Sequence, residues 1–247
     1  MIEFKGVIFD LDGVICSTDR YHYLAWKKAV EHLDVPFDEK INNRLRGVSR
    51  MDSLNIILEN YHGEISLEEK LSLCETKNAI YRKMLENMSM KDLPKDVLDT
   101  LVQLKGCGVK IAIGSSSKNT KLILSKLGIV DLFDAIADGN DIVNSKPHPE
   151  VFLCAAQKLG EEPSNCAVVE DATSGIEAAK AGGFYAIAIS DATKSPLADR
   201  IITKLPDILS YPPLQKTSFF LHVLIERCTN HPQNAPKNRQ PNQTMLF

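Results

Sequence analysis

Two aspartates follow an apolar run near the start of the chain, and this stretch constrains the fold most strongly. Residues 6–9 are continuously small or apolar, which is typical of a strand buried on both faces of a parallel sheet. Asp10 and Asp12 come directly after this run, where open α/β sheets bind ligands. A turn at Gly13 would direct both carboxylates into one cavity, where they suit a hard cation such as Mg²⁺. The alternative interpretation is a simple turn that closes a strand.

Length and composition limit the classes of protein to consider. The chain has 247 residues and a net charge of −3, which fits one sizeable domain or one domain with a smaller insert. The near-neutral net charge does not indicate binding to nucleic acid. No apolar run approaches the roughly 20 residues that are needed to cross a bilayer. The first predicted strand begins near the first residue, so we expect no signal peptide. The six cysteines form no Cys-x-x-Cys pair. We therefore expect a cytoplasmic protein with reduced thiols that binds neither nucleic acid nor membrane.

The rest of the chain divides by its periodicity. Residues 17–90 carry apolar side chains at helical spacing, for example Trp26, Ala29 and Leu33, with few strand-like runs. From about residue 91, helical segments alternate with apolar strands, which predicts a doubly wound parallel α/β sheet. These strands are expected at residues 110–114, 135–137, 166–169, 185–189 and 200–202. We therefore expect a Rossmann-like core of residues 1–16 and 91–215, with an inserted α-helical cap of residues 17–90. Residues 216–247 are atypical, and their Asn, Gln and Pro content predicts disorder.

Polar groups also follow the later predicted strands. The segment 115–119 begins with three serines and suits a phosphate at a helix N-terminus. The alternative interpretation is a serine N-cap for the following helix. Lys146 can neutralise a phosphate and the acids, or it can be a solvated loop residue. Glu170 and Asp171 offer more oxygen ligands, or they complement a helix dipole. Together with the first two aspartates, these groups predict one phosphate and Mg²⁺ site at one edge of the sheet.

In this order, the motifs resemble those of the haloacid dehalogenase superfamily. They are Phe-Asp-Leu-Asp-Gly-Val at 9–14, a serine that ends a strand, Ser-Lys-Pro at 145–147 and Glu-Asp-x-x-x-Gly at 170–175. Further segments resemble the β-phosphoglucomutase family within it, namely residues 10–15, 21–22, 25–26, 45–50, 117–119 and 135–138. The resemblance covers about residues 4–210 and implies the superfamily's core fold with a cap inserted after the first motif.

The resemblance implies specific roles for the core residues. Asp10 would be the nucleophile that becomes an aspartyl phosphate, and Asp12 would be the general acid and base. Lys146 and Ser115, with the backbone amide of Ser116, would stabilise the phosphoryl group during its transfer. The Mg²⁺ ligands would be the Asp10 carboxylate, the Asp12 carbonyl, Asp171 and, through water, Glu170. The family also has a cis peptide before the proline, so the Lys146–Pro147 bond is expected to be cis.

A mutase binds a bisphosphate in two orientations and needs a second anion site. The resemblance assigns this site to Arg50 of the cap, because its guanidinium can bind phosphate in a bidentate manner, and to core residues Ser117, Lys118 and Asn119. The other expected substrate-binding residues belong to the cap or its hinge: Thr18, His22, Trp26, Gly47, Val48, Ser49, Ser53 and Lys77. Thr18 is the hinge candidate. His22, Trp26 and Lys77 each also have a purely structural interpretation.

The resemblance implies the isomerisation of β-glucose 1-phosphate and glucose 6-phosphate through a 1,6-bisphosphate, and we expect a monomer that acts on this small phosphosugar. One alternative is a Mg²⁺-dependent sugar-phosphate phosphatase on the same scaffold. Another is a non-catalytic binding protein, but crowded carboxylates are costly to retain without a use.

Overall fold

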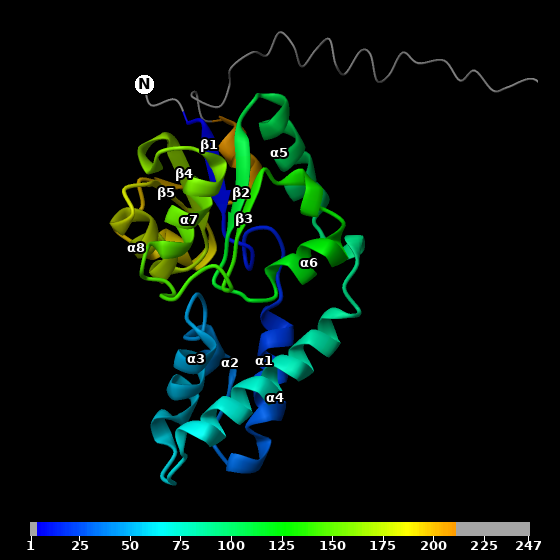
Figure 1. The fold of residues 1–247 in the computed structure, drawn as a ribbon, viewed down its shortest axis with the longest axis vertical. Coiled ribbons are helices and arrows are strands. Elements are labelled where there is room, and N and C mark those ends of the chain that lie inside the picture. The colour runs from blue at the N-terminus through cyan, green and yellow to red at the C-terminus, as the bar shows by residue number, and fades with distance from the viewer. Residues whose placement is uncertain (1–3, 211–247) are drawn as a thin grey trace, which may run out of the picture. The chain divides into compact units, whose positions relative to one another are not determined.

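The computed structural model describes residues 4–210, whose centre is a parallel sheet of six strands with helices on both faces (Figure 1). The spatial order is β3-β2-β1-β4-β5-β6, and each neighbouring pair is parallel. The strands are β1 (Gly6–Phe9), β2 (Lys110–Gly114), β3 (Ala135–Ala137), β4 (Cys166–Glu170), β5 (Tyr185–Ala188) and β6 (Arg200–Ile201). The predicted doubly wound sheet is confirmed, and each strand ends within one residue of its expected limits.

The central strand β1 is buried on both faces, as its continuous apolar run predicts. Val7 and Phe9 belong to the apolar cluster that also contains side chains of α5 (Lys95–Gly106) and α6 (Thr120–Leu127). Ile8 points to the opposite face and packs with α7 (Glu150–Leu159) and α8 (Thr173–Ala181). Successive strand residues point to opposite faces, so a strand covered on both sides is apolar at every position.

The winding of the sheet reverses at β1, because β2 lies on one side of it and β4 on the other. The connections diverge at such a switch point and leave a crevice beyond the carboxyl ends of the strands. This topology places the residues that follow β1, β2 and β4 around one opening.

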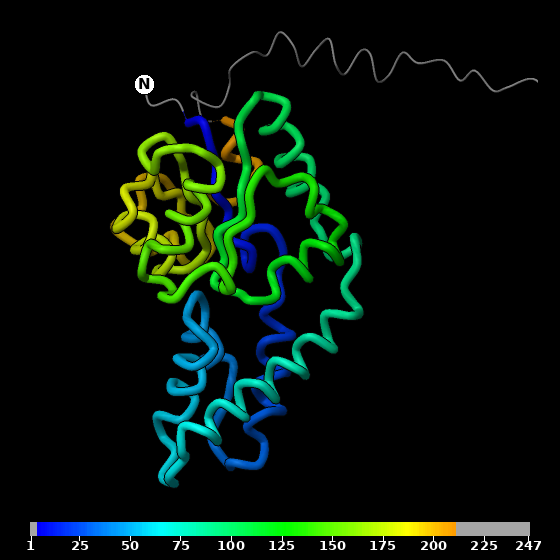
Figure 2. The backbone as a smooth tube through the Cα atoms, in the orientation of Figure 1, coloured from blue at the N-terminus to red at the C-terminus, as the bar shows by residue number. Residues whose placement is uncertain are grey.

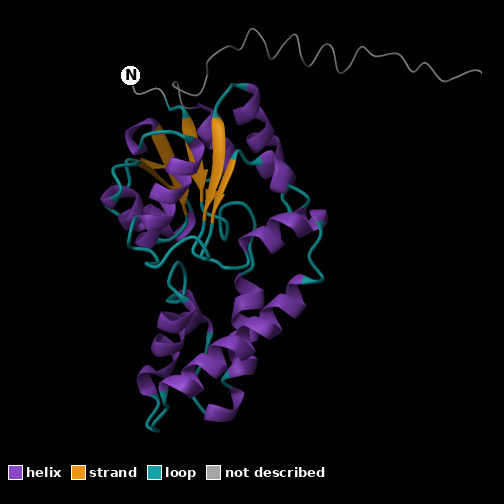
Figure 3. Ribbon diagram, viewed as in Figure 1, coloured by secondary structure: helices purple, strands orange, loops and turns teal. Residues whose placement is uncertain are grey.

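The segment between β1 and α5 is helical, and no strand interrupts it in the described chain (Figure 3). Its helices are α1 (Asp19–Ala29), α2 (Glu39–Asn43), α3 (Arg50–Ile57) and α4 (Leu67–Leu85). Trp26, Leu54 and Leu73 form part of a small apolar core of their own. The path of the backbone shows the chain leaving the sheet after β1 and returning through α4 (Figure 2). We call this segment the cap; its exact domain limits stay a prediction.

Local sequence signals explain where the cap helices begin. Ser49 is the N-cap of α3 and accepts a hydrogen bond from the Asp52 amide, as serine commonly does at a helix start. Ser66 and Glu69 form a capping box at the start of α4.

The cysteines at positions 16, 74, 107, 154 and 166 are unpaired thiols, as expected. Among residues 4–210, no helix has the length and apolar character needed to cross a bilayer. The sixth cysteine, Cys228, and the predicted disordered tail 216–247 lie outside the described residues.

Candidate active site

The loop after β1 turns at Gly13 and directs both aspartates into one cleft. Gly13 has a φ of 80°, a conformation that residues with a side chain rarely adopt. A Cβ at this position would also overlap the carboxylate of Asp171, which therefore packs directly against the turn. Asp10 and Asp12 line the same cleft. This position requires glycine for two separate reasons, the backbone conformation and the approach of Asp171.

Lys146 is a buried cation between two carboxylates. Its Nζ donates to Asp10 Oδ1 and to Glu170 Oε1, each at 2.5 Å, and its side chain is only 1% exposed. Burial favours the neutral amine, but Asp10 and Glu170 raise the pKa of Lys146 above its ordinary value. The interpretation as a solvated loop lysine is wrong, and the Lys146–Pro147 peptide is cis as predicted.

Asp171 is a carboxyl group that needs a positive partner. Burial, followed by repulsion from Glu170 and Asp10, raises the pKa of Asp171 to about 8. A divalent cation between Asp10 and Asp171 would relieve this repulsion, and the donors are the hard oxygens that Mg²⁺ prefers. No group of three or more His, Cys, Asp or Glu side chains in residues 4–210 could hold a metal by itself. Mg²⁺ usually binds one or two carboxylates, waters and substrate phosphate, so the donor set fits this ion.

Asp12 is held by the residue that begins the cap. The Thr18 amide donates to Asp12 Oδ1 at 3.1 Å, and the Thr18 hydroxyl donates to the same oxygen. The Tyr81 hydroxyl of α4 lies 2.8 Å from the Thr18 hydroxyl. Burial raises the pKa of Asp12 to about 6, although the hydrogen bond from Thr18 opposes the shift. Asp12 can therefore exchange a proton near neutral pH.

His22 and Lys77 connect Asp12 to the interior of the cap. Burial and the nearby charges of Lys77 and Arg50 lower the pKa of His22 well below its usual value, so the ring is neutral. Lys77 Nζ lies 2.8 Å from His22 Nδ1, and the protonated amine can only donate to this nitrogen, which then leaves the ring proton on Nε2, 4.0 Å from Asp12 Oδ2. This last contact is therefore not an ion pair. Lys77 is buried and lies over the rings of Trp26 and Tyr81.

The segment after β2 supplies groups suited to an anion. Ser115 Oγ accepts a hydrogen bond from the Ser117 amide, whereas Ser116 Oγ is buried without a partner. An orphaned buried hydroxyl in the cleft is a site where a ligand oxygen can bind. The N-cap of α6 is Asn119 rather than a serine, so the serines are not the helix cap that the alternative interpretation required.

Asn119 is engaged by the cap. Its Oδ1 accepts from Arg82 at 3.1 Å and its Nδ2 donates to Asn78 at 3.0 Å, and both partners belong to α4. Lys118, by contrast, forms no ion pair within residues 4–210.

The loop before α3 contacts the core. Gly47 has a φ of 74°, and a Cβ there would reach the Ser174 hydroxyl of α8. Arg46 pairs with Asp19 at the start of α1 and with Asp191 of the core. Arg50, the first residue of α3, donates to Glu75 Oε1 of α4 at 3.1 Å.

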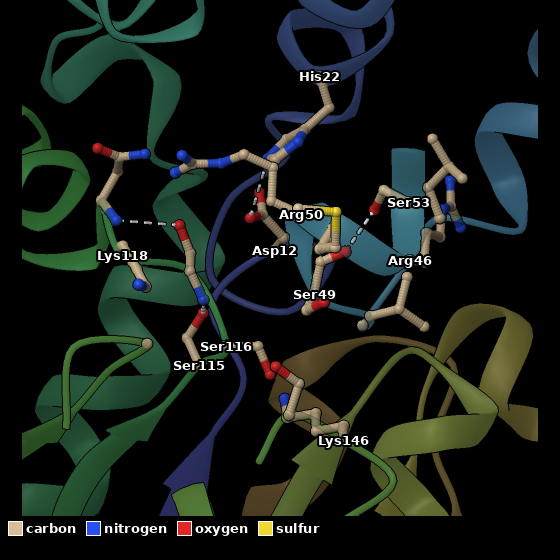
Figure 4. Close-up of a pocket in the computed structure, with 18 of the residues that line it drawn as sticks. Asp12, His22, Arg46, Ser49, Arg50, Ser53, Ser115, Ser116, Lys118 and Lys146 are labelled. Atoms are coloured by element: carbon tan, nitrogen blue, oxygen red, sulfur yellow. Dashed lines mark hydrogen bonds and ion pairs between the residues drawn. The ribbon is translucent and has the colours of Figure 1, made fainter. Parts of the chain in front are cut away.

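A single cleft of about 380 Å³ unites these groups. His22 and Arg50 enter it from the cap, and Ser115, Ser116 and Lys146 enter it from the core (Figure 4). Every residue predicted for the site lines the cleft except Thr18, which instead holds Asp12.

The sequence interpretation missed several side chains that line or support the cleft: Asp19, Arg46, Glu75, Asn78 and Tyr81. One signal was available for Tyr81, because it lies four residues after Lys77 and so shares its face of the helix. The others depend on contacts between separate helices or between cap and core.

Comparison with known proteins agrees with this geometry. The family model described as haloacid dehalogenase-like hydrolase matches residues 4–183. A β-phosphoglucomutase of Bacillus subtilis is 40% identical over 206 residues, which cover 83% of this chain and 91% of that protein. A phosphorylated carbohydrates phosphatase of Thermotoga maritima is 31% identical over 186 residues, covering 74% and 83%. The crystal structure of a β-phosphoglucomutase from Clostridium difficile superposes with a TM-score of 0.78 at 34% identity, covering 92% of this chain and all of that one. The chain therefore belongs to the haloacid dehalogenase-like hydrolase family and resembles its β-phosphoglucomutase members.

Proposed function

We propose that this protein isomerises β-glucose 1-phosphate and glucose 6-phosphate by way of an aspartyl phosphate and β-glucose 1,6-bisphosphate. The observation that carries the proposal is the cleft itself, which joins the buried Asp10–Lys146 pair to the guanidinium of Arg50. A phosphosugar bisphosphate needs two separated anion sites, and these two groups come from the core and the cap respectively. The relatedness to β-phosphoglucomutases supports the same activity.

Asp10 is the nucleophile in this mechanism. Its carboxylate attacks the phosphorus of the bisphosphate, the bond from phosphorus to the sugar oxygen breaks, and an aspartyl phosphate forms. Lys146 stays charged because it is paired with two carboxylates, so it can stabilise the negative charge of the transferring group. Ser115 and the unpartnered Ser116 hydroxyl would bind the remaining phosphoryl oxygens.

Mg²⁺ would be held by the Asp10 and Asp171 carboxylates and the Asp12 carbonyl, with Glu170 reached through water. When bound, the ion supplies neutralising charge to the phosphoryl oxygens. Asp171 supports this assignment, because burial and the charges of Glu170 and Asp10 raise its pKa, and a cation would relieve that repulsion.

Asp12 acts as the general acid and base. It gives a proton to the departing sugar oxygen and takes one from the sugar hydroxyl that attacks the aspartyl phosphate in the second half of the reaction. Its pKa of about 6 suits both directions at neutral pH. Thr18 fixes the carboxylate where the chain enters the cap, so any movement of the cap at this hinge is coupled to the position of Asp12.

The second anion site would consist of Arg50 with Ser117, Lys118 and Asn119. After a sugar hydroxyl has attacked the aspartyl phosphate and formed the bisphosphate, the bisphosphate must leave this arrangement and rebind with its ends exchanged before Asp10 attacks it. Trp26, Val48, Ser49 and Ser53 line the cleft beside it and would contact the sugar. We also propose that the protein acts as a monomer on this small substrate.

The second candidate function is a Mg²⁺-dependent sugar-phosphate phosphatase, which the similarity to the Thermotoga maritima phosphatase favours. Both activities form the aspartyl phosphate and differ in whether a sugar hydroxyl or water accepts it. The mutase must exclude water from Asp10 while the aspartyl phosphate exists.

One experiment separates these functions. The protein is supplied with β-glucose 1-phosphate, Mg²⁺ and a trace of β-glucose 1,6-bisphosphate, and the products are followed by ³¹P NMR. Glucose 6-phosphate without free phosphate supports the mutase, and stoichiometric free phosphate supports the phosphatase. Absence of both products would contradict each of them.

A further inference from the structure

The guanidinium that is proposed to bind the second phosphate already has an anionic partner. Arg50 Nη1 donates to Glu75 Oε1 at 3.1 Å, and within residues 4–210 no other carboxylate pairs with this guanidinium. The two side chains come from different helices, α3 and α4, and both line the cleft. Their exposure differs greatly, since the side chain of Arg50 is 23% exposed and that of Glu75 is 75% exposed.

The surroundings of Arg50 are otherwise cationic. The charge of Arg50 contributes to lowering the pKa of both Lys77 and His22, so these two neighbours are basic groups that offer Arg50 no negative charge. The other cap carboxylate in the cleft, Asp19, is paired with Arg46. Glu75 is therefore the group that balances Arg50 when no phosphate is bound.

A phosphate can readily replace Glu75 as the partner of Arg50. An ion pair whose carboxylate is mostly exposed is weak, because water solvates the charge almost as well as the partner does. A phosphate dianion that binds Arg50 in a bidentate manner needs two N–H donors, one of which now points at Glu75. The incoming phosphate must displace Glu75 or remain beside a like charge, and either outcome weakens its binding.

We propose that Glu75 is a positioning residue that occupies Arg50 while the second anion site is empty and competes with the phosphate for it. This inference rests on the proposed function, because it explains how a bisphosphate held at two anion sites is released quickly enough to turn round. Dissociation rates respond most strongly to such local contacts. The carboxylate of Glu75 thus lowers the affinity of the second anion site for the bisphosphate and allows faster turnover.

The test measures binding directly. In an Asp10→Asn background, which prevents turnover, β-glucose 1,6-bisphosphate and glucose 6-phosphate are titrated with Mg²⁺ present by calorimetry. Glu75→Gln should tighten bisphosphate binding about threefold or more, and the gain should shrink at high salt because the interaction is screened. Glu68→Gln is the matched control, since it removes the same charge from α4 at an exposed position outside the cleft and should leave the affinity unchanged.

A double-mutant cycle shows whether the effect acts through Arg50. In an Arg50→Ala background, Glu75→Gln should no longer tighten binding. In the active enzyme, Glu75→Gln should lower both KM and kcat, since the bisphosphate is bound more tightly and released more slowly; a merely structural role would not lower KM. Unchanged or weaker bisphosphate binding by Glu75→Gln, or an equal gain without Arg50, would overturn the inference.

The outcomes for this inference and for the proposed function are distinguishable. Tighter binding by Glu75→Gln in a protein that releases free phosphate would support the role of Glu75 and refute the mutase. Formation of glucose 6-phosphate without any tightening would support the mutase and refute the role of Glu75.

Discussion

Replacement of Lys77 by methionine should stabilise the protein, and it should do so more at pH 6 than at pH 9. Lys77 is 3% exposed, and its ammonium group contacts a neutral histidine and two aromatic rings rather than a carboxylate. Burial, and then the charge of Arg50, lowers its pKa from 10.5 to about 7. Methionine has a similar length and fills the same space without a charge.

The magnitude follows from the two pKa values. A depression from 10.5 to about 7 corresponds to about 4.8 kcal/mol of unfavourable free energy for the charged form. Below pH 7 the lysine is protonated in both states, so the folded protein bears this full penalty. Between pH 7 and 10.5 the folded state has lost the proton while the unfolded chain keeps it, so stability rises with pH. The stabilisation by Lys77→Met should therefore be smaller at pH 9 than at pH 6 by about 2.7 kcal/mol.

Urea unfolding at the two pH values measures this difference. Trp26 is the only tryptophan of the chain and its ring faces Lys77, so its fluorescence reports on this part of the cap. Lys83→Met on the same helix removes an exposed lysine and should show no such pH dependence. Because Lys77 also lowers the pKa of His22, the pair of measurements is repeated in a His22→Gln background to remove that contribution. A stability difference that is equal at pH 6 and pH 9 would refute the reasoning.

Three further outcomes are expected. Asp10→Asn should abolish turnover while its circular dichroism spectrum and melting temperature stay near those of the wild type, and retained activity would exclude Asp10 as the nucleophile. Arg50→Ala should reduce isomerisation far more than formation of the phosphoenzyme from the bisphosphate, as measured by rapid quench; equal loss of both would remove the second-phosphate role. Gly13→Ala should destabilise the protein by about 1–3 kcal/mol in urea unfolding, because a side chain at a φ of 80° is strained, and should weaken Mg²⁺ binding in calorimetry, because its Cβ displaces Asp171. Wild-type behaviour of the Gly13→Ala variant in both assays would contradict the packing of Asp171 against this turn.

Short-range patterns in the sequence are sufficient to predict the sheet and the part of the site that the core supplies. A strand buried on both faces is apolar at every position, so β1 and β4 were visible as continuous apolar runs. The acids that follow these strands had to meet, because the carboxyl ends of parallel strands share one edge of the sheet. Asp10 and Asp171 could therefore be assigned to one site from their order in the chain alone.

Side-chain pairing inside the site could not be predicted in this way. Lys146 donates hydrogen bonds to both Asp10 and Glu170, and these buried contacts hold its charged amine in one position. Nothing in the residues around Lys146 indicates that it is almost fully buried. Burial depends on how α7 and the loop before it cover the sheet, which is a property of the whole fold.

Contacts of the cap were the least predictable part of the site. Local sequence signals are enough to define α4, because helical periodicity and the capping box involve residues close together in the chain. Three contacts of α4 depend instead on how this helix packs against other helices and against the core: Glu75 with Arg50, Tyr81 with Thr18, and Arg82 with Asn119. Local patterns specify which face of a helix is apolar, whereas the angle and depth at which two faces pack select the side chains that meet.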